Sequence, residues 1–96
     1  MLFVLTCIDK PHAGALRMEI RPRHLAYIDA NRAAVKLAGP FLSDDGQAMT
    51  GSLIVLEVEN LAAAQAFAAA DPYALGGLFA SVDIRAWRCT IGAIAP

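Results

Sequence analysis

The sequence predicts an α+β protein of the ferredoxin-like class, with the element order βαββαβ and a four-stranded antiparallel sheet that carries its helices on one face. Three observations lead to this expectation. The chain has only 96 residues, 57% of them are hydrophobic, and strand-like and helix-like segments alternate in that order. A chain of this length has room for one core, so we expect a single domain over residues 1–96.

The chain begins with an apolar segment that is typical of a buried strand. Met1–Ile8 is continuously apolar apart from one threonine, and Asp9-Lys10-Pro11 ends it. A strand with one solvent-facing side would alternate apolar and polar residues. We therefore expect this strand to be covered on both faces.

The segment that follows, His12–Arg32, has helical spacing but contains a proline. Its apolar positions do not align on one face at about 100° per residue. These positions are Leu16, Ile20, Leu25 and Ile28. Because a proline inside a helix bends or restarts it, we expect two helical segments, the second beginning at Pro22.

The second half of the chain supplies the other four elements. Val35–Leu42 is predicted to be a short strand, in which Gly39-Pro40 indicates a bulge or an edge position. Gly51–Val58 is predicted to be a strand that is apolar on both faces. Asn60 is a good N-cap for a helix over Leu61–Ala70, and Phe79–Ile91 alternates as a final strand.

Composition argues against several classes of function. The 8 Lys and Arg residues nearly balance the 9 Asp and Glu residues, so no basic surface for nucleic acid is expected. No apolar segment is long enough to span a membrane, and the first residues do not resemble a signal peptide. The two cysteines, Cys7 and Cys89, form no recognisable framework, so we expect both to be reduced and inert in a cytoplasmic protein.

The motifs of cofactor and metal sites are also missing from the sequence. There is no G-x-G-x-x-G, no P-loop and no metal-ligand spacing of His, Cys and acidic residues. We therefore expect neither a cofactor nor a metal. The helices of this fold cover one sheet face only, so the two-sided apolar strands predict that a second copy of the chain covers the other face.

His24 and Asp71 are the two residues best suited to acid–base chemistry. Histidine titrates near neutral pH, and a carboxylate can orient its ring and increase its basicity. Each residue also has a simpler interpretation. His24 can be a partly exposed helix residue, and Asp71, which precedes Pro72, can merely cap a short turn.

Four further side chains are candidates for binding a small molecule. Tyr73 can line a pocket or cover the core, and Ser52 can face a pocket or simply begin a strand. Arg17 and Arg21 lie four residues apart on one helical face and can hold a carboxylate. The alternative for the two arginines, which the sequence favours, is a solvated face that pairs with Glu19 or with a neighbouring chain.

Several segments together resemble a known family, the YciI-like proteins. The segments are Arg21-Pro22-Arg23-His24-Leu25-Ala26-Tyr27-Ile28, Ala38-Gly39-Pro40, Gly51-Ser52-Leu53, Asp71-Pro72-Tyr73, Gly77-Leu78-Phe79 and Val82-Asp83-Ile84-Arg85-Ala86-Trp87. They occur in order along nearly the whole chain. The part from Asp71 to the final strand is the most specific.

The resemblance implies a ferredoxin-like fold that dimerises as an α/β barrel-like assembly. It also implies a site centred on a histidine and an aspartate, which fall on His24 and Asp71. Relatives are linked to dehydrohalogenation of chlorinated hydroxymuconates, and the wider superfamily includes muconolactone isomerases. The substrate of this chain does not follow from these similarities.

These considerations lead to one main hypothesis and two alternatives. The main hypothesis is a small cofactor-independent enzyme in which His24 and Asp71 carry out proton transfer, elimination or isomerisation on a small carbonyl or carboxylate compound. Ser52, Tyr73 and Arg21 would contact this substrate. The first alternative is a non-catalytic sensor or ligand-binding subunit on the same dimeric scaffold. The second is an interaction module whose apolar sheet face docks another protein.

Overall fold

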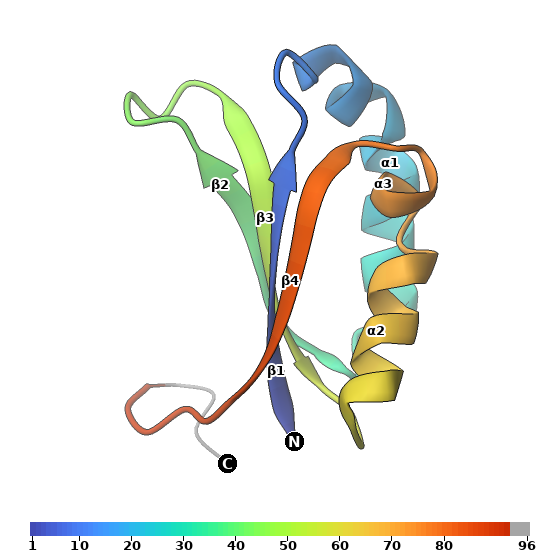
Figure 1. The fold of residues 1–96 in the computed structure, drawn as a ribbon, viewed down its shortest axis with the longest axis vertical. Coiled ribbons are helices and arrows are strands. Elements are labelled where there is room, and N and C mark those ends of the chain that lie inside the picture. Colours follow the sequence, from blue (N-terminus) through green and yellow to red (C-terminus); the bar gives the residue numbers. More distant parts are fainter. Residues whose placement is uncertain (93–96) are drawn as a thin grey trace.

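A computed structural model describes residues 1–92 as a two-layer α+β fold. In chain order, its elements are β1 (Leu2–Asp9), α1 (Gly14–Ala30), β2 (Val35–Leu42), β3 (Met49–Glu57), α2 (Leu61–Ala70), α3 (Pro72–Leu75) and β4 (Phe79–Trp87). The expected βαββαβ order is confirmed, with the one-turn helix α3 added between α2 and β4 (Figure 1).

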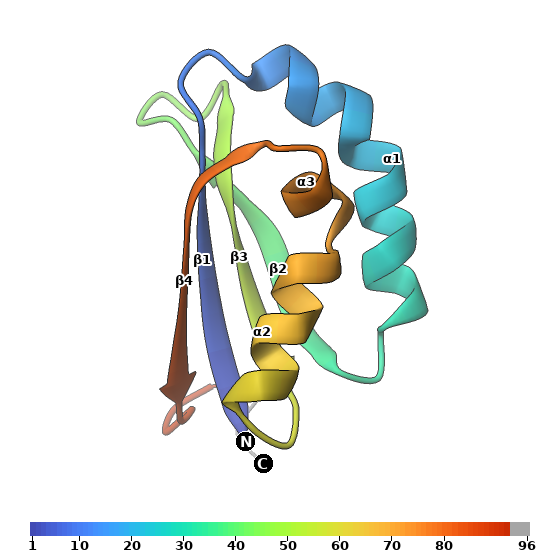
Figure 2. The ribbon, with the colours of Figure 1, turned by 45° about the vertical axis from the view of Figure 1, so that its right-hand side comes forward.

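The four strands form one antiparallel sheet in the order β2-β3-β1-β4, and all helices lie on the same side of it (Figures 1 and 2). Leu5 of β1 is opposite Ile54 of β3 and Ile84 of β4, and these residues face the helices. Alternate residues, such as Val4 and Val55, face the other side, where the described chain places no helix. The single-faced helix layer is therefore as predicted.

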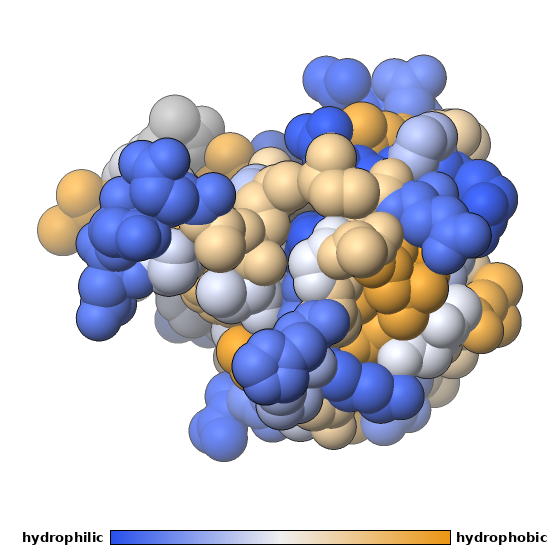
Figure 3. Space-filling view, turned by 90° about the horizontal axis from the view of Figure 1, so that it is seen from above, coloured by the Kyte–Doolittle hydropathy of each residue, from blue (hydrophilic) through white to orange (hydrophobic). Residues whose placement is uncertain are grey.

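Seen from above, the turn between β2 and β3 projects as a hydrophilic lobe on the side away from the helices (Figure 3). Ser43 and Asp45 fix this turn through a hydrogen bond between their side chains, and the backbone N–H of Gln47 also donates to Asp45. Within residues 1–92, no helix is long and apolar enough to cross a membrane.

The prediction of two helical segments around Pro22 is wrong, because α1 runs as one helix from Gly14 to Ala30. Pro22 cannot donate a hydrogen bond to the carbonyl of Met18, four residues earlier. Both residues lie on the exposed side of α1. Water can satisfy that carbonyl there, so the proline is tolerated inside the helix.

The predicted end of the last strand is also wrong. β4 ends at Trp87 rather than Ile91, because its last pair joins Trp87 to Leu2, where β1 begins. Cys89 therefore lies outside the sheet, near the beginning of β1. Cys7 is opposite Val82, so the two cysteines are not placed side by side. Both are free thiols.

Candidate active site

The buried polar side chains of residues 1–92 gather between α1 and the sheet. The core-facing side of α1 contributes Arg17 and His24, together with the apolar Ile20. Spacings of three and four residues place these three on one stripe of the helix. The other buried polar residues are Ser52 of β3 and Asp71, which precedes α3.

Arg17 is held by an acidic residue at the end of β1. Its Nε and Nη2 atoms donate to the two oxygens of the Asp9 carboxylate at 2.7 and 3.0 Å. Nη2 also donates to Oγ of Ser52 at 2.8 Å, and Nη1 donates to the Tyr73 hydroxyl at 3.4 Å. Arg17 therefore ties the end of β1 to β3 and α3.

His24 meets Asp71 across the space between α1 and α3. Nδ1 of His24 lies 2.8 Å from Oδ1 of Asp71, and the same oxygen accepts a hydrogen bond from the backbone N–H of Tyr73 at 2.9 Å. A carboxylate only accepts hydrogen bonds, so Nδ1 carries the proton in this pair. The lone pair of the neutral ring is then on Nε2.

Nε2 of His24 faces open space. No buried side-chain nitrogen or oxygen lacks a hydrogen-bond partner among residues 1–92. Within residues 1–92, the His24 side chain makes one hydrogen bond, through Nδ1, and its ring lines a cavity. Because Nε2 has no hydrogen-bond partner there and is not among the buried unpaired atoms, it is the ring nitrogen that is exposed to the cavity.

Tyr73 connects the arginine and histidine parts of the site. Its ring stacks on His24 with 4.0 Å between ring centroids, and Cζ of Arg17 lies 4.5 Å from the centroid of the same ring. Phe79 supports the ring edge-on. Burial raises the pKa of the Tyr73 hydroxyl, against the opposite influence of Arg17 and Arg21, so Tyr73 stays neutral and can donate a hydrogen bond.

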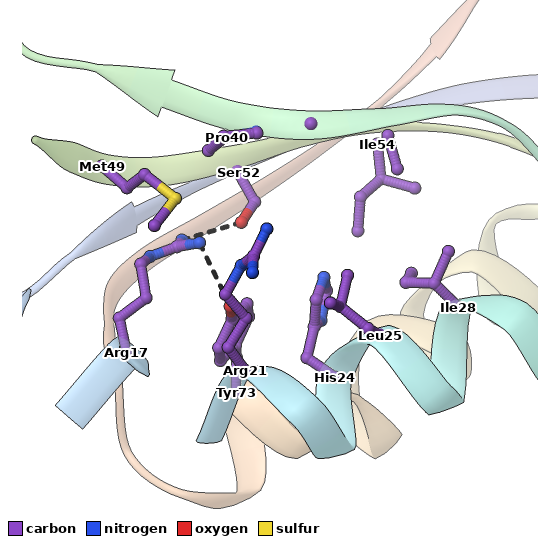
Figure 4. Close-up of a pocket in the computed structure, with 12 residues that line it drawn as sticks. Arg17, Arg21, His24, Leu25, Ile28, Pro40, Met49, Ser52, Ile54 and Tyr73 are labelled. Carbon is purple, nitrogen blue, oxygen red and sulfur yellow. Dashed lines mark hydrogen bonds between the residues drawn. The ribbon is translucent and has the colours of Figure 1, made fainter. Parts of the chain in front are cut away.

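The cavity between α1 and the sheet has a volume of about 210 Å³. Arg17, Arg21 and His24 extend from α1 toward the strand that carries Ser52 (Figure 4). The remaining walls are mostly apolar: Leu25, Ile28, Ala38, Gly39, Pro40, Met49 and Ile54, with Tyr73 between the polar groups. An apolar pocket with a few converging polar groups is the usual form of a small-molecule site.

Two glycines allow this close assembly. A Cβ atom on Gly51 would collide with the carbonyl oxygen of Cys7 on β1, so glycine is required beside Ser52. A Cβ atom on Gly76 would lie 2.5 Å from Cδ1 of Ile20. The close approach at Gly76 holds the end of α3, and with it Tyr73, against α1.

The structure brings all five predicted site residues together. His24 and Asp71 form a hydrogen-bonded pair, and Tyr73, Ser52 and Arg21 line the cavity. One preference is wrong: Arg17 is buried and paired with Asp9, not on a solvated face paired with Glu19. Asp9 was missed as a part of the site. The available signal was that Asp9 ends an apolar strand shortly before a helix that carries Arg17.

The described residues show no group of three or more His, Cys, Asp and Glu side chains that could hold a metal ion. Cys7 is a buried residue of β1 near the charged groups of the site. Burial, followed by the nearby negative charge of Asp71, raises the pKa of the Cys7 thiol to about 12. This thiol therefore remains protonated near neutral pH.

Comparison with known proteins identifies the family. The YCII-related domain matches residues 1–88, which is nearly the whole chain. The chain belongs to the YCII-related family.

Two relatives are similar to this chain over nearly its whole length. Protein YciI of Escherichia coli O6:H1 is 36% identical over 95 residues, which cover 92% of this chain and 97% of that protein. An uncharacterized protein of Haemophilus influenzae is 33% identical over the same shares of the two chains.

A solved structure is similar as well. It is the 5-chloro-2-hydroxyhydroquinone dehydrochlorinase TftG of Burkholderia phenoliruptrix AC1100, in complex with 2,5-dihydroxybenzoquinone. The TM-score is 0.85 at 32% identity, covering 92% of this chain and 94% of that one. A fold of this kind therefore supports an enzyme that acts on a small molecule.

Proposed function

We propose that this protein is a small cofactor-independent enzyme in which His24 acts as the general base and Asp71 orients it. The observation that carries the proposal is the division of roles between the two ring nitrogens of His24. Nδ1 is bonded to Asp71 at 2.8 Å, and Nε2 faces a cavity large enough for a small substrate. A histidine oriented in this way is the usual arrangement of a general base.

The proposed reaction begins with removal of a proton from a carbon next to a carbonyl or carboxylate. Nε2 of His24 takes the proton, and the electron pair of the C–H bond moves toward the carbonyl oxygen. Asp71 stabilises the imidazolium that results. The electron pair then expels a leaving group, which is an elimination, or His24 returns the proton to another carbon, which is an isomerisation.

The other cavity residues have roles in binding. Ser52 and Tyr73 present hydroxyl groups whose positions Arg17 fixes, and Arg21 adds a positive charge. The similarity to TftG supports a substrate of one oxygenated ring. In the diketo tautomer of a chlorinated ring of this kind, His24 can remove a proton from the carbon next to one carbonyl while the C–Cl bond on the adjacent carbon breaks, so loss of HCl is an elimination of the proposed kind. We therefore propose a small oxygenated ring compound as the substrate.

The experiment is a chloride-release assay with 5-chloro-2-hydroxyhydroquinone, accompanied by proton-exchange measurements in D₂O on the same compound. His24→Ala should lower either rate by at least about 100-fold, the lower end of what an acid–base residue contributes. His12→Ala is the matched control, because His12 is exposed and lies before α1. Full activity in His24→Ala would refute the proposal, whereas binding without turnover or exchange would favour the ligand-binding alternative.

The pairing of His24 with Asp71 is tested separately from activity. The ¹⁵N chemical shifts of the His24 ring report which nitrogen carries the proton. We expect the proton on Nδ1 in the wild-type protein and a mixture of tautomers in Asp71→Asn, because an amide can either donate or accept. Identical ring shifts in the two proteins would contradict the pairing.

We also propose that the protein is a cytoplasmic homodimer in which a second copy covers the open sheet face. Exposed apolar side chains on that face support this, among them Ile8, Leu37 and Trp87. Light scattering should give twice the chain mass of 10.2 kDa. A monomer at micromolar concentration would contradict the dimer.

A further inference from the structure

The charges around the cavity are unequally compensated. Arg17 makes a two-point contact with Asp9, and its charge is therefore balanced inside the protein. His24 is bonded to Asp71. Arg21, the other charged cavity residue, has no acidic partner among residues 1–92.

The two carboxylates lie behind the residues to which they bond. Neither Asp9 nor Asp71 lines the cavity, and no other acidic side chain of residues 1–92 does. A ligand therefore meets two guanidinium groups and a histidine ring, but no negative charge. Arg21 is half-buried, and its side chain extends from α1 toward the strand of Ser52 (Figure 4).

We infer that the proposed enzyme acts on organic anions, and that Arg21 is the residue that binds their negatively charged oxygen. This inference rests on the proposed function and gives its substrate class. The oxygen belongs to a carboxylate or to an ionised hydroxyl group. Either group can accept one or two hydrogen bonds from the N–H groups of a guanidinium.

The position of Arg21 relative to His24 sets the size of the ligand. The two residues are three positions apart on α1, and such residues lie on one face of a helix, one turn apart. A molecule of one ring can therefore contact both. The volume agrees, because an engineered cavity of about 150 Å³ already holds benzene and this cavity has about 210 Å³.

The test compares ligands of nearly equal shape that differ in charge. Benzoate and benzamide form the carboxylate pair, and 4-nitrophenolate and 4-nitroanisole form the ionised-hydroxyl pair. Binding is measured from the NMR shifts of backbone amides around the cavity. We expect at least one anion to bind about 10-fold more tightly than its neutral partner, the effect of a hydrogen bond to a charged group. The pair that shows the preference identifies the type of oxygen.

Substitutions assign the preference to Arg21. Arg21→Gln should abolish it and Arg21→Lys should keep part of it. Arg23→Gln is the matched control, because it removes the same charge from the exposed side of the same helix and should change the preference less than about 2-fold. Amide spectra of each variant establish that it is folded.

The outcomes separate this inference from the proposed function. Equal binding of anion and neutral partner, no binding of any probe up to its solubility limit, or a preference that survives Arg21→Gln would overturn the inference while leaving the role of His24 open. An anion preference that persists in His24→Gln supports the inference. If the same variant also retained full turnover, the role of His24 as the base would be refuted, but the inference about Arg21 would still stand.

Discussion

Helices α1 and α2 cover the same face of one sheet, but they bury different kinds of side chain. The buried residues of α1 are Arg17, Ile20 and His24, and those of α2 are Ala64 and Phe67. Beneath α1 the polar groups bond to one another and leave a cavity. Beneath α2, Ala64 and Phe67 pack in the apolar cluster of the sheet. The region under α1 therefore serves binding, and the region under α2 serves stability.

This difference predicts different costs of substitution. Under α1, the cost of a change comes from a charge that loses its partner. Under α2, the cost comes from volume alone. The following three experiments test this contrast, beginning with the largest expected effect.

Arg17→Met should lower the free energy of unfolding by about 3–5 kcal/mol, because it leaves the buried Asp9 carboxylate without a partner. Urea unfolding measures this loss. The double variant Asp9→Asn with Arg17→Met should recover part of it, and Arg23→Met on the exposed side should change stability by less than about 0.5 kcal/mol. If Arg17→Met unfolded at the wild-type urea midpoint, the ion pair would have no structural role.

Ala64→Val should cost about 1–3 kcal/mol, because Ala64 is fully buried between α2 and the sheet and has no space for two more methyl groups. The same substitution at exposed Ala62 is the control and should cost only the small difference in helix propensity. Ligand affinity should be unchanged in both variants, since no residue of α2 lines the cavity. A large loss of affinity in Ala64→Val would contradict the separation of the two regions.

The third effect is a loss of stability that depends on the Cys7 thiol and appears only at alkaline pH. Cys7 packs in the apolar cluster with Ala64 and Phe67, and the burial raises its pKa from 9.0 to about 12. Because the folded state holds this proton more tightly, the stabilisation is complete below pH 9 and is lost as the pH rises toward 12. Urea unfolding at about pH 7 and about pH 10 should therefore show a steeper loss in the wild-type protein than in Cys7→Ala. Equal losses would mean that the thiol ionises freely in the folded state.

The contrast between the helices also explains how much the sequence could predict. The range of α2 matches the prediction, Leu61–Ala70, and Asn60 caps it by accepting a hydrogen bond from the N–H of Ala63. Its apolar residues and its cap are local signals. The βαββαβ element order and the single helix layer also follow from local patterns and common topology.

The prediction for α1 was wrong in the place where the site lies. The sequence pattern treats only apolar residues as buried, so it omits Arg17 and His24 from the buried face. Without them, the apolar residues before and after Pro22 fall on different faces of the helix. Counted with Ile20, Arg17 and His24 form one stripe at spacings of three and four residues. Burial of Arg17 depends on Asp9, which belongs to another element, and no local pattern reports that partnership.

The hydrogen bonds of the site join segments that are far apart in the chain. Those of Arg17 span 8, 35 and 56 residues, and the bond of His24 spans 47. During folding, each of the long ones requires a large loop to close, which is slow and comes after local structure. Formation of α1 therefore precedes formation of the site, which needs β3 and α3 in place. In a refolding experiment, helix signal should return first, and ligand binding should return only when the last segments have docked.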